Sequence, residues 1–112
     1  MEIRDNDSFY IIAPLSSKID DYETGRIISE IMGDNRNIGL DLRYVLDCTI
    51  DFIENLKNVC KLKNISIFNI NSDVFAIFNY MKMDKYVNLF VSELDFEENR
   101  RQIINRAFSL VK

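Results

Sequence analysis

Residues 37–56 read NIGLDLRYVLDCTIDFIENL and contain the two patterns that decide the fold. The first six residues, NIGLDL, are mostly apolar and β-prone, which predicts a buried strand. From Thr49 onward the apolar residues recur at the spacing of a helix face, with Ile53, Leu56 and Cys60 on one side. A strand followed by an amphipathic helix is the repeating unit of α/β proteins.

The same alternation extends in both directions along the chain. Upstream, EIRD and FYIIAPL flank the turn-forming residues 6–8 and predict a hairpin, and residues 20–32 predict an amphipathic helix. Downstream, residues 65–70 (ISIFNI) and 86–91 (YVNLFV) predict two further strands.

Two serines mark the expected starts of the last helices. Ser72 is expected to cap one helix, and Ser92 with Asp95 resembles a capping box before the final one. The predicted order is ββαβαβαβα, a single α/β domain over residues 1–112 with a mixed four- to five-stranded sheet packed with about four helices. The residues expected to face inward from the final helix are Phe96, Ile103, Ile104, Ala107 and Phe108.

Composition and charge exclude several classes of partner. The chain is 47% apolar and 29% charged, as in ordinary globular proteins, and its net charge is −4. This negative charge does not favour nucleic acid or anionic lipid. The acidic N-terminus lacks the features of a signal peptide, and no apolar run is long enough to span a membrane. Since Cys48 and Cys60 are also expected to be unpaired, we expect a cytoplasmic protein without direct membrane insertion.

Common catalytic constellations are missing from the sequence. There is no histidine, which excludes Ser-His, Cys-His and His-metal sites. The glycines at positions 25, 33 and 39 are scattered, so no glycine-rich phosphate loop is predicted. We therefore expect a protein that is not an enzyme and that uses no cofactor and no metal ion.

The candidate site lies at the carboxyl ends of the strands, where parallel sheets place their functional loops. These ends are residues 16–20, 43–51 and 71–73. The expected partner-binding residues are Tyr44, Asp47, Cys48, Thr49, Asp51 and Phe52 around the second helix, and Ser17, Lys18, Asp20, Asn71 and Ser72 in the other loops.

Several of these residues have a structural and a functional interpretation. Thr49 is either a helix N-cap or a phosphorylation site, and Asp51 either complements the helix dipole or imitates a phosphate. Cys48 is either a buried thiol or a reactive one at a helix start. Tyr44 and Phe52 are either core residues or exposed anchors for a partner.

Three stretches of the chain resemble motifs of the STAS domain family, whose members include the bacterial anti-sigma factor antagonists. Residues 13–32 are similar to that family's strand, Leu-Asp pair and first helix, with Ile19-Asp20 standing at the pair. Residues 37–42 look like its central strand, which ends in Asp-Leu, and residues 71–90 are similar to its later helix and strand. In this last stretch the matching positions are Ser72, Phe78, Met83, Asp84 and Phe90.

The chain departs from the family at the phosphorylation switch, an Asp-Ser-(Ser/Thr/Ala)-Gly at the start of the second helix. Counting without a gap from Asp41 aligns residues 49–52 (TIDF) with this motif. Shortening the loop by two residues aligns residues 47–50 (DCTI) instead, which suits the helix length better. Neither alignment retains the phosphorylated serine or the glycine, so we expect the usual switch to be lost.

The resemblance implies a regulatory module that binds a protein partner, an anti-sigma factor kinase or a related regulator, without the phosphoserine switch. An alternative is a cytoplasmic STAS-like accessory subunit of a lipid or anion transport system. A third interpretation is a protein that binds a small ligand or a nucleotide in a crevice between the same strand-end loops. No nucleic-acid partner is expected, and a homodimer is compatible with the sequence.

Overall fold

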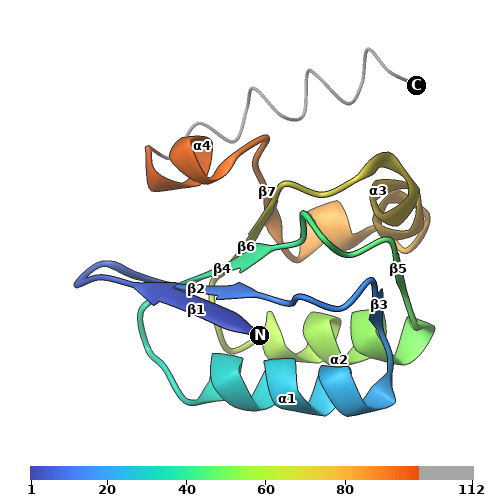
Figure 1. Ribbon diagram of the computed structural model, residues 1–112, viewed down its shortest axis with the longest axis horizontal. Helices are drawn as coiled ribbons and strands as arrows, with labels where there is room; N and C mark the ends of the chain where they lie inside the picture. Colours follow the sequence, from blue (N-terminus) through green and yellow to red (C-terminus); the bar gives the residue numbers. More distant parts are fainter. Residues whose placement is uncertain (99–112) are drawn as a thin grey trace.

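The computed structural model describes residues 1–98, in which strands and helices alternate along the chain (Figure 1). The strands are β1 (Glu2–Asp5), β2 (Phe9–Ala13), β3 (Lys18–Ile19), β4 (Asn37–Asp41), β5 (Asp47–Cys48), β6 (Ile65–Phe68) and β7 (Asn88–Leu89). The helices are α1 (Asp21–Met32), α2 (Ile50–Val59), α3 (Ser72–Tyr80) and α4 (Glu93–Glu97), with a 3₁₀ turn, η1, at Met83–Lys85.

The main sheet has the strand order β1-β2-β4-β6-β7. The β1–β2 hairpin is antiparallel, and the pairs β2–β4, β4–β6 and β6–β7 are parallel. The hairpin turn is stabilised by the Asn6 side-chain oxygen, which accepts from the backbone N–H groups of Ser8 and Phe9 at 2.7 and 3.0 Å. The predicted α/β class with a mixed sheet is confirmed.

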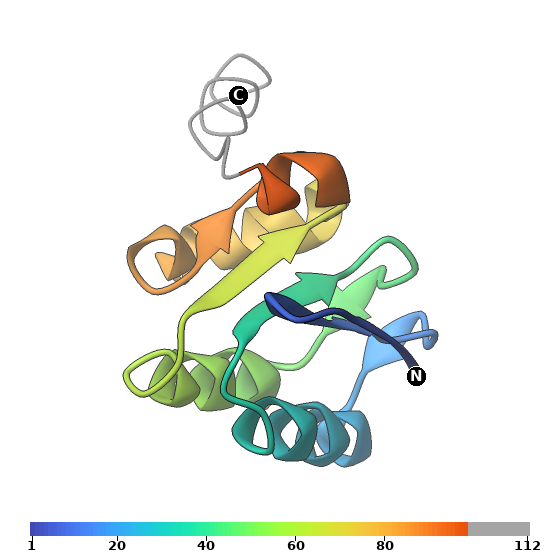
Figure 2. The same cartoon turned by 90° about the vertical axis from the view of Figure 1, so that its left-hand side faces the viewer.

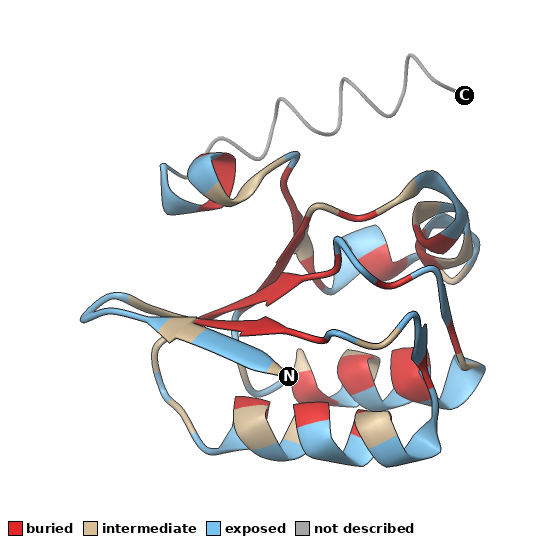
Figure 3. Ribbon diagram, viewed as in Figure 1, coloured by how far each residue is buried: buried red, intermediate tan, exposed pale blue. Residues whose placement is uncertain are grey.

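Three helices pack on one face of this sheet. The parallel strands β2, β4, β6 and β7 lie side by side in the sheet in the same order as in the chain. Right-handed connections between them therefore place α1, α2 and α3 on the same side of the sheet. Their apolar faces form one buried cluster with the strands, including Ile27 of α1, Phe52 of α2 and Phe78 of α3. Figure 3 shows β4 and β6 buried and the outer faces of α1 and α2 exposed.

The opposite face of the sheet carries a smaller aromatic core beneath α4. Figure 2 shows α4 on the other side of the sheet from α1 and α2. Phe96 of α4 stacks on Phe68 with ring centroids 5.3 Å apart, and it meets Phe90 edge-on at 5.7 Å. Gly39 allows this close packing, because a Cβ at that position would lie 2.9 Å from Phe68 Cε1 and 3.1 Å from Phe96 Cε2.

Two details differ from the sequence prediction. The last strand is only Asn88–Leu89 rather than residues 86–91. Asn71, not Ser72, caps α3, since the Asn71 side-chain oxygen accepts from the Val74 N–H at 2.9 Å and Ser72 is the first helical residue. The inward-facing residues expected beyond position 98 lie outside the described residues, whereas Phe96 is buried as predicted.

Replacing Gly39 by alanine should destabilise the protein, because the added methyl group must displace two packed rings. We expect a loss of about 1–3 kcal/mol in the free energy of unfolding, measured by denaturant titration. Gly25→Ala is the matched control, since a Cβ there has no neighbour within 4 Å and the position lies inside α1. That control should gain about 0.5–1 kcal/mol, and equal effects of the two variants would contradict the packing described for α4.

Candidate functional site

Two short strands that the sequence analysis missed hold two of the strand-end loops side by side. β3 and β5 pair in parallel, with Lys18 opposite Asp47. The backbone N–H groups of Leu46 and Asp47 both donate to the Ser17 carbonyl, at 2.7 and 3.1 Å. The loop before α1 and the loop before α2 are therefore joined by backbone hydrogen bonds rather than by side-chain contacts alone.

The third loop is attached by one side chain. Asn71 donates from Nδ2 to the Val45 carbonyl at 2.6 Å while its oxygen caps α3. Asn71 thus joins the loop after β6 to the loop after β4. We call the resulting face, formed by residues 15–20, 43–51 and 71–73, the strand-end surface. It contains the loops in which the sequence analysis placed the candidate site.

Four exposed apolar side chains lie on the strand-end surface. Leu15 is 57% exposed, Tyr44 52%, Leu46 61% and Ile50 64%. Single exposed apolar residues are normal, but four on loops that are tied together form a candidate interface. Tyr44 could be predicted from the sequence and the other three could not, because a pair such as Val45-Leu46 does not reveal which residue faces out.

The charge of the strand-end surface is mainly negative. Asp20 and Asp47 are exposed, and Asp51 occupies the first turn of α2. Lys18 lies 4.0 Å from Asp47 and offsets part of this charge. The starts of α1, α2 and α3 all carry a side-chain cap and an acidic residue in the first turn, so their N–H groups do not favour a bound phosphate.

Three of the predicted site residues have the structural role, rather than the functional one, of the two roles that the sequence allowed. Phe52 is fully buried in the main core, so the expectation that it is an exposed anchor is wrong. Cys48 is only 8% exposed, and burial together with nearby Asp47 raises the pKa of its thiol to about 11. A thiol with that pKa is protonated at neutral pH and is a weak nucleophile. Thr49 caps α2, accepting from the Phe52 N–H at 3.2 Å.

A buried carboxylate lies directly beneath this surface. Asp41, at the end of β4, is fully buried and accepts from Arg4 Nη2 at 2.8 Å and from Asn69 Nδ2 at 3.1 Å. Arg43 also donates to it, from Nε at 3.1 Å and from Nη2 at 3.0 Å. Arg4 in turn binds Glu93 of α4 at 2.6 Å. The two guanidinium groups and the amide favour the ionised carboxylate and lower its pKa despite the opposing effect of burial.

The backbone around Asp41 is adapted to this arrangement. Asn69 has a φ of 57°, a left-handed conformation that asparagine tolerates better than most residues. The Arg43 N–H donates to Asp41 Oδ1 at 3.2 Å, and the Leu42 N–H donates to the Phe68 carbonyl at 3.1 Å. The exits from β4 and β6 are therefore fixed relative to each other before their loops enter the strand-end surface.

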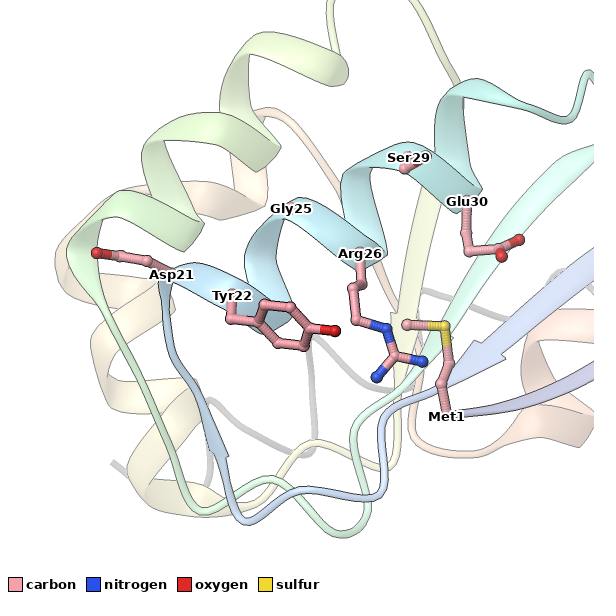
Figure 4. Close-up of a pocket in the computed structure, with 7 residues that line it drawn as sticks. All are labelled: Met1, Asp21, Tyr22, Gly25, Arg26, Ser29 and Glu30. Atoms are coloured by element: carbon pink, nitrogen blue, oxygen red, sulfur yellow. The ribbon is translucent and has the colours of Figure 1, made fainter.

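A hollow of about 540 Å³ follows the outer side of α1 (Figure 4). Figure 4 shows Met1, Tyr22 and Arg26 around it, and Gly25 leaves the helix surface bare. Arg26 already pairs with Glu23 at 3.3 Å and lies over the Tyr22 ring, so its charge is engaged within the helix. Among residues 1–98, no buried polar side chain lines this hollow.

No protein-family model matches this chain, and no curated protein matches it either. The resemblance to the STAS family remains a prediction from the sequence motifs. Among residues 1–98, no helix combines the length and the apolar character needed to cross a membrane. Within the same residues, no group of three or more Cys, Asp or Glu side chains is arranged to hold a metal ion.

Asp41→Asn should remove the part of the free energy of unfolding that the wild-type protein loses at acidic pH. The pKa of Asp41 is lowered from an ordinary value of 3.8, so its ionised form stabilises the fold at neutral pH. That stabilisation is lost as the pH falls below about 4 and through the folded-state pKa. We expect Asp41→Asn to lose about 2–3 kcal/mol at pH 7 and less at acidic pH, measured by denaturant titration across pH.

Arg43→Gln is the companion variant, because it removes one of the two guanidinium groups and leaves the carboxylate in place. It should reduce the acid-sensitive part of the stability without abolishing it. A wild-type protein and an Asp41→Asn variant whose stabilities fall in parallel on acidification would contradict the role given to this carboxylate.

Proposed function

We propose that this chain is a non-enzymatic regulatory module that binds a protein partner through the strand-end surface. The observation that carries the proposal is the exposure of Leu15, Tyr44, Leu46 and Ile50 on loops joined by the β3–β5 pairing and by Asn71. Protein interfaces commonly combine an apolar centre with a polar rim. A surface that is already ordered also loses little conformational entropy when a partner docks.

The rim of this surface indicates the chemistry of the partner. The exposed carboxylates of Asp20, Asp47, Asp51 and Asp73 outnumber the cations of Lys18 and Arg43. A complementary surface therefore has an apolar centre with lysine or arginine side chains around it. The free thiols of Cys48 and Cys60 fit a reducing compartment, and we place the protein in the cytoplasm.

The motifs that resemble the STAS family suggest the class of partner. They favour an anti-sigma factor kinase or a related regulator, and the strand-end surface includes the start of the second helix, where the resemblance places the switch. The phosphorylated position aligns either with Cys48, which is buried, or with Ile50, which has no group to modify. Regulation in this proposal acts through binding or expression rather than through a phosphoserine.

Leu46→Asp should weaken partner binding while leaving the fold intact, because Leu46 is 61% exposed and makes its hydrogen bond through the backbone. The experiment is affinity capture from the source cells, identification of the bound protein, and titration of the purified partner by calorimetry. We expect Leu46→Asp to weaken binding at least about 30-fold, as for a residue at the centre of an interface.

Leu62→Asp is the matched control, since Leu62 is 73% exposed and lies in the turn after α2, away from the strand-end surface. It should bind the partner like the wild type. If both variants bind equally well, or if Leu62→Asp alone loses binding, the strand-end surface is not the docking site.

Incubation with the captured partner and ATP should leave this chain without stoichiometric phosphate, because neither alignment of the switch motif retains a serine. Intact-mass spectrometry measures this directly. Phosphate at one group per chain that disappears in Thr49→Ala would show that Thr49 replaces the lost serine. Thr49→Ala should also cost about 1 kcal/mol through loss of the α2 cap, so Thr49→Asn, which keeps a capping side chain but has no hydroxyl to phosphorylate, separates the two effects.

A further inference from the structure

A polar pocket of about 500 Å³ lies at the opposite edge of the sheet from the strand-end surface. Its floor is formed where the parallel strands begin, on the face that carries α4. Phe9 and Phe96 contribute apolar wall, and Glu97 contributes a carboxylate at the rim. The volume lies within the range of small-molecule sites, which is roughly 300–1,000 Å³.

Three asparagines form a hydrogen-bonded row along one side of this pocket. Asn88 Nδ2 donates to Asn64 Oδ1 at 3.0 Å, and Asn64 Nδ2 donates to Asn37 Oδ1 at 3.2 Å. These two hydrogen bonds fix the orientation of the amides. The Nδ2 group of Asn37 lies at the end of the row. Side-chain amides presented in a fixed orientation suit ligands that carry hydrogen-bond donors and acceptors of their own.

Ser66 contributes a hydroxyl to the floor of this pocket. It pairs with Gly39 on one side and Asn88 on the other in the sheet register, is only 4% exposed, and lines the pocket. Its hydroxyl makes no hydrogen bond within the part of the chain that the structure describes, residues 1–98. No fully enclosed side-chain nitrogen or oxygen lacks a hydrogen-bond partner among residues 1–98, so the Ser66 hydroxyl is reached from the pocket and is available to a ligand or to water.

We propose that this pocket binds a small uncharged ligand that combines an apolar ring face with hydrogen-bonding groups on its edge. The amide row and the Ser66 hydroxyl bind the polar edge, Glu97 accepts from an N–H or O–H group, and Phe9 and Phe96 contact the apolar face. The only charged side chain that lines the pocket among residues 1–98 is the carboxylate of Glu97, so these residues favour an uncharged ligand over a phosphate group. Nucleosides and monosaccharides share this chemistry.

The test is a titration of the full-length ¹⁵N-labelled chain followed by NMR. One arm uses adenosine, guanosine, cytidine and uridine, and the other uses glucose, galactose and N-acetylglucosamine. We expect one arm to shift the side-chain NH₂ signals of Asn37, Asn64 and Asn88 with saturation, at a dissociation constant of about 0.1–1 mM for a ligand of this size. AMP should bind no more tightly than adenosine.

Ser66→Ala separates binding from folding, because it removes a hydroxyl that has no partner in the described fold. The variant should keep or increase the unfolding free energy and weaken the ligand at least about tenfold. Ser29→Ala, on the exposed side of α1, should bind like the wild type. The proposal is overturned if no compound gives saturable shifts, or if Ser66→Ala binds as tightly as the wild type. Neither result bears on the strand-end surface, which lies at the other edge of the sheet.

Discussion

The ionised carboxylate of Asp41 is the constraint on which the strand-end surface depends. It sits without solvent exposure at the end of β4 and binds Arg4 from β1, Arg43 from the following loop and Asn69 from the exit of β6. Leaving such a charge unpaired costs several kcal/mol, so the exits from β4 and β6 have little freedom to move independently. Arg4 extends the same network to α4 through Glu93.

The sheet has two edges with different chemistry, and its strand order explains why. Within residues 1–98, the order of the parallel strands in the sheet never reverses relative to their order in the chain. This part of the sheet therefore has no topological switch point, where neighbouring loops diverge and leave a crevice. At the carboxyl edge the loops are instead drawn together by the β3–β5 pairing, which produces a surface suited to docking. At the other edge, Asn37, Asn64 and Ser66 border a pocket beside α4.

The α/β class could be predicted from the sequence because each main element has a strong local pattern. NIGLDL and ISIFNI are apolar runs that become the central strands β4 and β6, and Thr49 and Ser92 cap helices as their positions suggest. The location of the candidate loops follows from the same order of elements. The STAS resemblance and the partner class stay predictions.

The parts that could not be predicted depend on contacts between distant segments. β3 and β5 are two residues each, too short for a periodic pattern, and exist because their backbones meet in space. The burial of Phe52 and Cys48 and the exposure of Leu46 depend on how α2 and its loop pack, which residue type does not reveal. The pocket at Ser66 needs three strands in register, a relation that no single stretch of sequence contains.

Hydrogen exchange of this chain with and without its captured partner tests the central claim most directly. If the strand-end surface is the docking site, the partner should slow exchange of the backbone amides at residues 15–20, 43–51 and 71–73, while the outer face of α1 and the Ser66 pocket remain unchanged. Protection confined to α1 or to the Ser66 edge, with no change in those three loops, would contradict the account.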